Sequence, residues 1–294
     1  MDGLRCGFIG LGAMGTPMAG HLNARGLLAV VGNRSHDKAI ARAAEWGVRA
    51  ASEPADFAGC DCVVLCLPAD PDVLQWVEAL AGVLAPGAVV VDHSTVAADT
   101  ARQAAECLDR AGIGFLDAPV SGGVEGARNG RLSIMVGGRG DQIERIRPAL
   151  DAYAVRIAHL GAVGQGQACK AVNQVMVAGI NEAVCEALAL GRALGLDPDV
   201  LLPTLSAGAA GNWFLEKRGA TLMRGEFNPG FKCAHLLKDL DIVAGMARAV
   251  GIDSSVIAQA SVDYRRLVER GLGEADTSAL VLLKGPVGTT DSNC

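Results

Sequence analysis

The chain has 294 residues, half of them hydrophobic and only 4% aromatic, a length that suits one large domain or two medium ones. Its formal net charge is −6 and it contains no basic run, which argues against a nucleic-acid-binding surface. The most apolar long stretch, 171–190, is interrupted by amide and carboxylate side chains, and no leader pattern precedes the first apolar run. We therefore expect a cytoplasmic protein that contacts neither membrane nor nucleic acid.

The cysteines do not form a ligand pattern. Nine are scattered along the chain, and the densest group is Cys60, Cys62 and Cys66. The last two belong to one apolar run, and no matching set of histidines or cysteines follows. We expect reduced thiols and no metal site.

A glycine-rich turn follows the first apolar run. Cys6–Ile9 reads as a strand, 13–25 is compatible with a helix, and G-x-G-x-x-G lies between them. Gly10 permits a sharp turn, Gly12 lets a pyrophosphate approach the backbone, and Gly15 allows the helix to pack closely on the strand. The helix N-terminus then offers free N–H groups and a favourable dipole to phosphates. The expected dinucleotide contacts are Gly10, Leu11, Gly12, Ala13, Met14 and Gly15.

The end of the second expected strand, 27–32, indicates which dinucleotide is bound. NAD-binding folds commonly place an acid there for the ribose hydroxyls, whereas this chain has Asn33 followed by Arg34 and Ser35. An arginine can form bidentate bonds with a 2′-phosphate, and a serine hydroxyl can add another donor. These three residues favour NADP, and NAD stays the alternative because Asp37 would offset part of the gain.

Strands and helices alternate over the first half of the chain. Further strands are expected at 62–67, 88–92, 114–118, 133–137 and 155–159, and helices at 37–46, 72–84, 97–111 and 140–152. This alternation predicts an α/β fold with a parallel, doubly wound Rossmann-type sheet, whose ligands bind at the carboxyl ends of the strands.

Three loops follow strands at that expected edge. Leu67 and Pro68 end one strand, and Thr95 lies just after another. The third loop contains Ser121, Gly122 and Gly123, whose backbone N–H groups and serine hydroxyl could hold a carboxylate. Function tends to concentrate at loop positions of this kind, although the third loop could also be a plain flexible turn before the next strand.

The composition changes near Gly161. Strand-like segments nearly vanish, and a long helix-compatible run extends from Gln167 to about Leu194. We expect an NADP-binding Rossmann domain over 1–161, an all-helical substrate and oligomerisation domain over 162–284, and a disordered tail over 285–294.

Three polar residues share one face of that long helix. Lys170 lies three residues before Asn173 and four before Gln174. A lysine in the first turns of an apolar helix has its charged form disfavoured by the dipole and by burial, which suits a proton-transfer group. From spacing alone, a solvated surface lysine is the better interpretation.

The chain resembles the β-hydroxyacid dehydrogenase family, which includes 3-hydroxyisobutyrate dehydrogenase, tartronate semialdehyde reductase and the glyoxylate/succinic semialdehyde reductases. The resemblance extends over about 240 residues and rests on four motifs in order: 7–15, 117–123, Gly164-Gln165-Gly166 leading into Lys170-Ala-Val-Asn173-Gln174, and Lys238-Asp239-Leu240. It implies an NADP-preferring oxidoreductase that acts on a small carboxylate-bearing aldehyde or hydroxy acid.

The resemblance also implies residue roles. Lys170 would be the general acid that protonates the carbonyl oxygen as the nicotinamide hydride attacks the carbon. Ser121, Gly122, Gly123, Asn173 and Gln174 would bind the substrate. Thr95, Leu67 and Pro68 would line the nicotinamide side, and Lys238 would contact both cofactor and substrate.

Several alternatives stay open. Gln174 stands where several family members have Asn, and Glu125 follows the glycine loop, so the substrate is not fixed. Trp213 and Phe214 are either pocket wall or helical core. The chain could instead be a non-catalytic NADP-binding scaffold or an imine reductase-like relative, and its apolar helices predict a homodimer or homotetramer.

Overall fold

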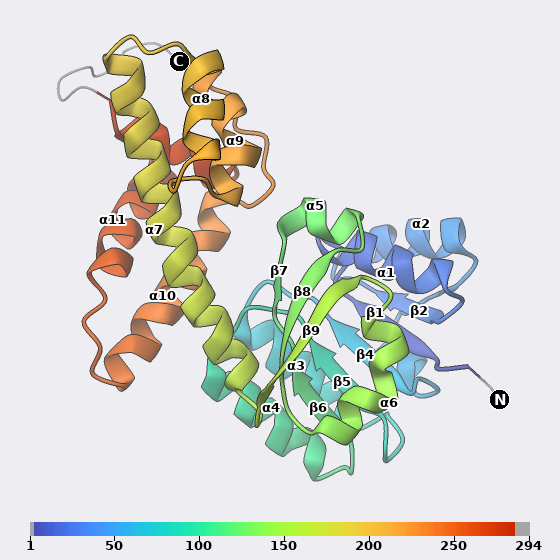
Figure 1. Cartoon of the computed structure of the whole chain (residues 1–294). Helices are drawn as coiled ribbons and strands as arrows, with labels where there is room; N and C mark the ends of the chain where they lie inside the picture. The colour runs from blue at the N-terminus through green and yellow to red at the C-terminus, as the bar shows by residue number, and fades with distance from the viewer. Residues whose placement is uncertain (1–2, 286–294) are drawn as a thin grey trace. The chain divides into compact units, whose positions relative to one another are not determined.

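The structure, a computed structural model, describes residues 3–285 (Figure 1). The chain divides into two compact units between Lys170 and Ala171, inside the helix α7 (Gln165–Ala193). The functional boundary expected near Gly161 stays a prediction. The expected tail lies, apart from Gly285, outside the described residues.

The first unit contains a sheet flanked by helices (Figure 1). Its strands are β1 (Cys6–Ile9), β2 (Leu28–Gly32), β3 (Arg49–Ala50), β4 (Cys62–Leu65), β5 (Val89–Asp92), β6 (Gly114–Asp117), β7 (Val120–Ser121), β8 (Leu132–Gly137) and β9 (Ala154–Gly161). Its helices are α1 (Gly15–Ala24), α2 (His36–Trp46), the 3-10 helix η1 (Pro54–Phe57), α3 (Asp70–Ala81), α4 (Ala98–Asp109), α5 (Gly123–Arg128) and α6 (Gly140–Leu150).

The strands follow the order β3-β2-β1-β4-β5-β6-β8-β7, and β9 pairs with β8. From β3 to β6 all neighbours are parallel, which confirms the Rossmann-type fold. The carboxyl ends of β1, β4, β5 and β6 therefore lie along one edge, as expected for a doubly wound sheet.

The expectation of a parallel sheet throughout is wrong at one side. β8 pairs antiparallel with both β6 and β7, and β7 and α5 were not anticipated. Gly122 and Gly123, with φ of 130° and 61°, reverse the chain after β7. Backbone of this hand is readily available only to glycine. The reversal also places the short helix α5 directly after the Ser121 loop.

Alternating strand residues fill two layers of core in this unit. Phe8 and Val64 face α1, α2 and α6, whereas Ile9 and Val63 face η1, α3 and α4. Helices therefore cover both faces of the sheet, which explains why the strands consist of continuous apolar runs.

The second unit is helical. Besides the rest of α7 it contains α8 (Pro198–Ala207), α9 (Trp213–Met223), α10 (Cys233–Ala249), α11 (Ser255–Glu269) and the 3-10 helix η2 (Thr277–Leu283). One apolar cluster joins α7, α9, α10, α11 and η2.

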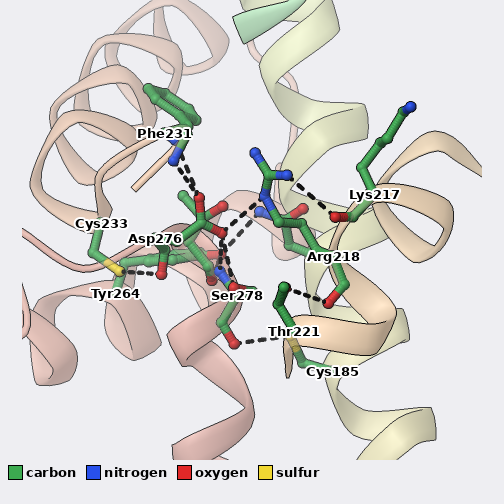
Figure 2. A network of polar contacts seen from close by, with 12 residues as sticks. Cys185, Lys217, Arg218, Thr221, Phe231, Cys233, Tyr264, Asp276 and Ser278 are labelled. Atoms are coloured by element: carbon green, nitrogen blue, oxygen red, sulfur yellow. Dashed lines mark hydrogen bonds and ion pairs between the residues drawn. The ribbon is translucent and has the colours of Figure 1, made fainter. Parts of the chain in front are cut away.

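A buried carboxylate organises the end of this unit (Figure 2). Asp276 Oδ2 accepts the backbone N–H groups of Gly230 (2.8 Å) and Phe231 (3.2 Å), and its Oδ1 accepts the hydroxyl of Ser278 (2.8 Å). Arg218 on α9 forms an ion pair with the same carboxylate at 3.3 Å. Asp276 thus ties η2 to α9 and to the loop that precedes α10.

No helix within residues 3–285 is long and apolar enough to cross a membrane. In the same residues, histidine, cysteine, aspartate and glutamate side chains form no group of three that could hold a metal ion. Burial raises the pKa of both Cys60 and Cys66 to about 12. These thiols are therefore protonated at neutral pH.

Candidate active site

The glycine turn after β1 has the geometry of a phosphate cradle. Gly10 has φ of 103°, and a Cβ there would lie 2.2 Å from the carbonyl oxygen of Cys66. A Cβ on Gly15 would lie 1.9 Å from the carbonyl oxygen of Gly10, whereas one on Gly12 would meet nothing within 4 Å. Gly10 and Gly15 are thus required by the turn itself, and Gly12 leaves open space in front of the helix N-terminus. The turn fits a dinucleotide pyrophosphate.

Asn33 braces this turn from the end of β2. Its Oδ1 accepts the Leu11 N–H at 2.9 Å, and its Nδ2 donates to the Ser35 carbonyl at 3.1 Å. Its amide therefore holds Leu11 and the start of α2 together. The neighbouring Arg34 side chain is exposed.

A cavity of about 760 Å³ adjoins the turn, and its cationic lining was not anticipated from the sequence. Leu11, Gly12 and Ala13 line one side of it. Lys38, Arg42 and Arg128 add three positive charges, of which Arg42 pairs with Glu45. Lys38 could have been suspected from the sequence because it lies only four residues after Arg34. Arg128 could not, because it lies on helix α5, which was not expected. The cavity suits a phosphorylated ligand.

The expected loops after β4 and β5 are joined. The Leu67 N–H donates to the Ser94 Oγ at 2.8 Å, so the Leu67–Pro68 loop is held by the residue before Thr95. Ser94 is itself buried, and its N–H donates to Asp92 Oδ1 at 2.9 Å. The two segments expected on the nicotinamide side therefore form one rigid edge.

Lys170 is placed beside the glycine loop that was expected to bind substrate. Its side chain is buried, 8% exposed, and its Nζ donates to the Val120 carbonyl at 3.0 Å. That carbonyl immediately precedes Ser121, Gly122 and Gly123. The structure thus unites these residues within the first unit.

The first turns of α7 are anchored by a buried acid. Asp117 accepts the N–H groups of Gly164 (2.8 Å) and Gln167 (2.9 Å) with its two oxygens. Burial raises the pKa of Asp117, and these backbone donors oppose the rise. The carboxylate accepts hydrogen bonds from N–H groups that a helix N-terminus leaves without helical partners. It therefore fixes the start of α7 and, with it, the position of Lys170 one turn further along the helix.

The predicted residues of the second unit form a network of their own. Asn173 Nδ2 donates to Gln174 Oε1 at 2.8 Å, and Gln174 Nε2 donates to Asp239 Oδ2 at 2.7 Å. Lys238 forms an ion pair with Asp239 Oδ1 at 3.0 Å. Because a carboxylate only accepts, Asp239 sets the orientation of both amides. Asp239 belongs to the Lys238-Asp239-Leu240 motif, but the sequence alone assigned it no role.

Three other residues considered from the sequence can now be placed. Phe214 is buried in the helical core. Trp213 is half exposed and lies against the Arg218 guanidinium at 5.5 Å. Glu125 is exposed on α5.

The glycine turn, the cationic cavity and the buried lysine lie in one Rossmann-type unit, an arrangement typical of nucleotide-binding folds. Residues 5–161 match the NAD-binding domain of 6-phosphogluconate dehydrogenase, and residues 164–283 match the NAD-binding domain of NADP-dependent 3-hydroxyisobutyrate dehydrogenase.

Individual relatives agree with these matches. The chain is 34% identical to 2-hydroxy-3-oxopropionate reductase of Escherichia coli, over 95% of this chain and 96% of that protein. It is 36% identical to 3-hydroxyisobutyrate dehydrogenase of Pseudomonas aeruginosa, over 83% and 85%. The structure of Mycobacterium tuberculosis 3-hydroxyisobutyrate dehydrogenase with L-serine superposes with a TM-score of 0.85 at 30% identity, covering 95% of this chain and 98% of that one. The chain belongs to the β-hydroxyacid dehydrogenase family.

Proposed function

We propose that this oxidoreductase interconverts a small hydroxy acid and its semialdehyde or keto acid with NADP as the preferred cofactor. The observation that carries the proposal is the Lys170 ammonium, buried and 3.0 Å from the carbonyl that precedes the Ser121 loop. This arrangement puts a proton donor next to a loop able to bind a carboxylate.

The residues divide the work as follows. The nicotinamide, when bound, donates or accepts the hydride. Lys170 gives a proton to the substrate oxygen during reduction and takes it back during oxidation. Ser121, Gly122 and Gly123 hold the substrate carboxylate through the serine hydroxyl and backbone N–H groups. Asn173, Gln174 and Lys238 are proposed as further substrate contacts on the basis of the family resemblance.

The NADP preference rests on charge at the end of β2. Arg34 and Lys38 are both exposed, and Lys38 lines the cationic cavity beside the glycine turn. No acid occupies position 33, where a carboxylate would repel a 2′-phosphate. The proposed cofactor contacts therefore comprise the glycine turn, Asn33–Ser35, Lys38 and the edge formed by Leu67, Pro68 and Thr95.

A homo-oligomer is proposed from one face of α7. Val172, Met176 and Leu190 are each about 60% exposed (64%, 63% and 59%). At 100° per residue they fall within one narrow stripe along the helix. An exposed apolar stripe of this kind suits contact with a second copy. Light scattering should show a dimer or tetramer, and a monodisperse monomer would contradict this part. The cytoplasmic location stays a prediction.

The reaction class is tested by NADPH oxidation with glyoxylate, succinic semialdehyde, tartronate semialdehyde and methylmalonate semialdehyde. Lys170→Ala should lower kcat by about 10³-fold while leaving the NADPH dissociation constant unchanged. Lys217→Ala, which removes an exposed lysine of α9, is the matched control and should retain activity. NADPH binding without turnover of any substrate would favour the non-catalytic scaffold, and turnover of imines alone would favour the imine reductase-like alternative.

The cofactor preference is tested separately. Arg34→Ala combined with Lys38→Ala removes two cations and should raise the KM for NADPH by about tenfold or more, while leaving the KM for NADH unchanged. Lys232→Ala serves as the control because its ammonium pairs with Glu274 in the second unit. An equal loss with both cofactors would contradict the role given to these cations.

A further inference from the structure

A buried histidine follows β5 in the first unit and takes no part in the proposed chemistry. His93 stands between Asp92 and Ser94 at the end of β5, and all three side chains are at most 3% exposed. Ser94 holds the Leu67 N–H, as described above, and its carbonyl accepts the Gln167 Nε2 at 2.8 Å. This tripeptide therefore touches two of the segments that build the site.

The His93 ring connects this tripeptide to a third segment, which contains Ala118. Its Nδ1 lies 2.5 Å from the Ala118 carbonyl oxygen, and its Nε2 lies 2.8 Å from the Tyr153 hydroxyl. A carbonyl can only accept, so the Nδ1 must carry the proton. In the neutral ring Nε2 is then the acceptor, and the Tyr153 hydroxyl must be its donor.

Burial keeps the ring neutral. It lowers the pKa of His93 to about 4. Tyr153 is fully buried, and its ring packs edge-on against the histidine at 5.5 Å. Both hydrogen bonds of the ring therefore have a fixed direction. The Tyr153 hydroxyl donates to Nε2, and the Nδ1–H donates to the Ala118 carbonyl.

The carbonyl that receives this bond belongs to the segment leading into the Ser121 loop. Its neighbours along the chain are also engaged: the Pro119 carbonyl accepts the Met135 N–H at 3.0 Å, and the Val120 carbonyl accepts Lys170 Nζ at 3.0 Å. Three successive carbonyls are therefore held by three different elements. The Ala118 N–H is also held, by the Asp92 carbonyl at 2.7 Å, so removing the His93 bond would release only the Ala118 carbonyl, two residues before the acceptor of Lys170.

We propose that His93, held as the Nδ1–H tautomer by Tyr153, is a positioning residue that fixes the 118–123 segment, and with it the carbonyl that orients Lys170. The proposal rests on the proposed function for its kinetic consequence, but its structural content does not need turnover. It gives a task to two buried polar side chains that neither bind the cofactor nor reach the substrate loop themselves.

The kinetic test compares three variants of the full chain. His93→Asn keeps an N–H near the position of Nδ1, so kcat should stay near the wild-type value. His93→Leu removes the donor and should lower kcat about 10- to 100-fold with an unchanged NADPH dissociation constant. His93→Gln carries its amide one carbon further out and replaces the leucine variant if that fails to fold. Equal kcat in the asparagine and leucine or glutamine variants would overturn the proposal.

The spectroscopic test needs no substrate. In the wild type, ¹⁵N shifts of His93 should show a protonated Nδ1 and an unprotonated Nε2, and Tyr153→Phe should move only the Nε2 signal toward that of a free acceptor. The amide resonances of Gly122 and Gly123 should shift in His93→Leu and stay in place in His93→Asn. A protonated Nε2, or unmoved glycine amides in His93→Leu, would overturn the proposal. Absence of wild-type turnover would instead count against the proposed function alone.

Discussion

The two units arrange their polar groups by different means. In the first, the turns proposed to face ligand are set by backbone conformation: open space at Gly12, left-handed φ at Gly10, Gly122 and Gly123, and the carbonyl before Ser121 that Lys170 contacts. In the second, buried carboxylates collect side chains around them, as Asp239 and Asp276 do. A turn set by glycine conformation tolerates few replacements of its glycines. A buried carboxylate instead depends on keeping each of its hydrogen-bond and ion-pair partners.

A third hub of the second unit offers the largest expected effect. Lys284 Nζ contacts Glu182 Oε2 at 2.5 Å and Asp263 Oδ2 at 2.7 Å, with all three side chains largely buried. Lys284→Met would leave two buried carboxylates close together, so we expect the free energy of unfolding to fall by about 4 kcal/mol. Urea denaturation followed by circular dichroism measures this.

The matched control for that change is Lys232→Met. Its partner Glu274 is 80% exposed and its own side chain is only partly buried, so the unfolding free energy should change by less than about 1 kcal/mol. The double variant Lys284→Met/Glu182→Gln should recover part of the loss because it removes one of the stranded charges. Equal effects of the two lysine changes would show that burial does not distinguish the hub from surface pairs.

Two glycines of the first unit give an internal contrast of intermediate size. Gly15→Ala forces a Cβ to within 1.9 Å of a backbone oxygen and should cost about 3 kcal/mol of stability. Gly12→Ala meets no protein atom, so stability should hold while NADPH affinity drops at least about tenfold. Thermal unfolding and NADPH titration by fluorescence separate the two outcomes. Undiminished NADPH binding by Gly12→Ala would remove Gly12 from the cradle.

The last comparison concerns acid, whose effect on stability is spread over the range from pH 6.5 to about pH 4. The pKa of His93 is about 4 when folded, against 6.5 ordinarily, so between these pH values the unfolded chain holds a proton that the folded chain lacks. The contribution of the neutral ring to the free energy of unfolding is complete above pH 6.5. This free energy then falls by about 1.4 kcal/mol per pH unit as the pH drops toward 4. Urea midpoints at a series of pH values should show this slope in the wild type and a shallower one in His93→Asn. An identical slope in both would mean that other groups dominate.

The sequence predicted the alternation of elements, because continuous apolar strands such as Cys62–Leu65 and the helix-compatible segments between them leave local patterns. It missed β7 and α5, since both arise where Gly122 and Gly123 reverse the chain and no apolar period marks them. The antiparallel pairing of β8 followed from that same reversal.

The site divided in the same way. The glycine turn and Lys170 were visible because each has a motif or a fixed helical spacing. Arg128 and His93 were not, because Arg128 only lines a cavity together with Gly12 once the chain is folded, and His93 bonds to Ala118, 25 residues away in sequence. Asp239 stood in a quoted motif, yet its hold on Gln174 became evident only from the packed helices.

The two bonds of Asn33 constrain how cofactor preference can change during evolution. An aspartate in its place would keep the acceptor for the Leu11 N–H but would set one of its oxygens against the Ser35 carbonyl, where Nδ2 now donates at 3.1 Å. The single replacement that introduces an NAD-type acid therefore carries a folding cost at the moment it arises. A lineage moving toward NAD would more readily first alter the backbone at Ser35, so the order of substitutions, as well as their identity, is restricted.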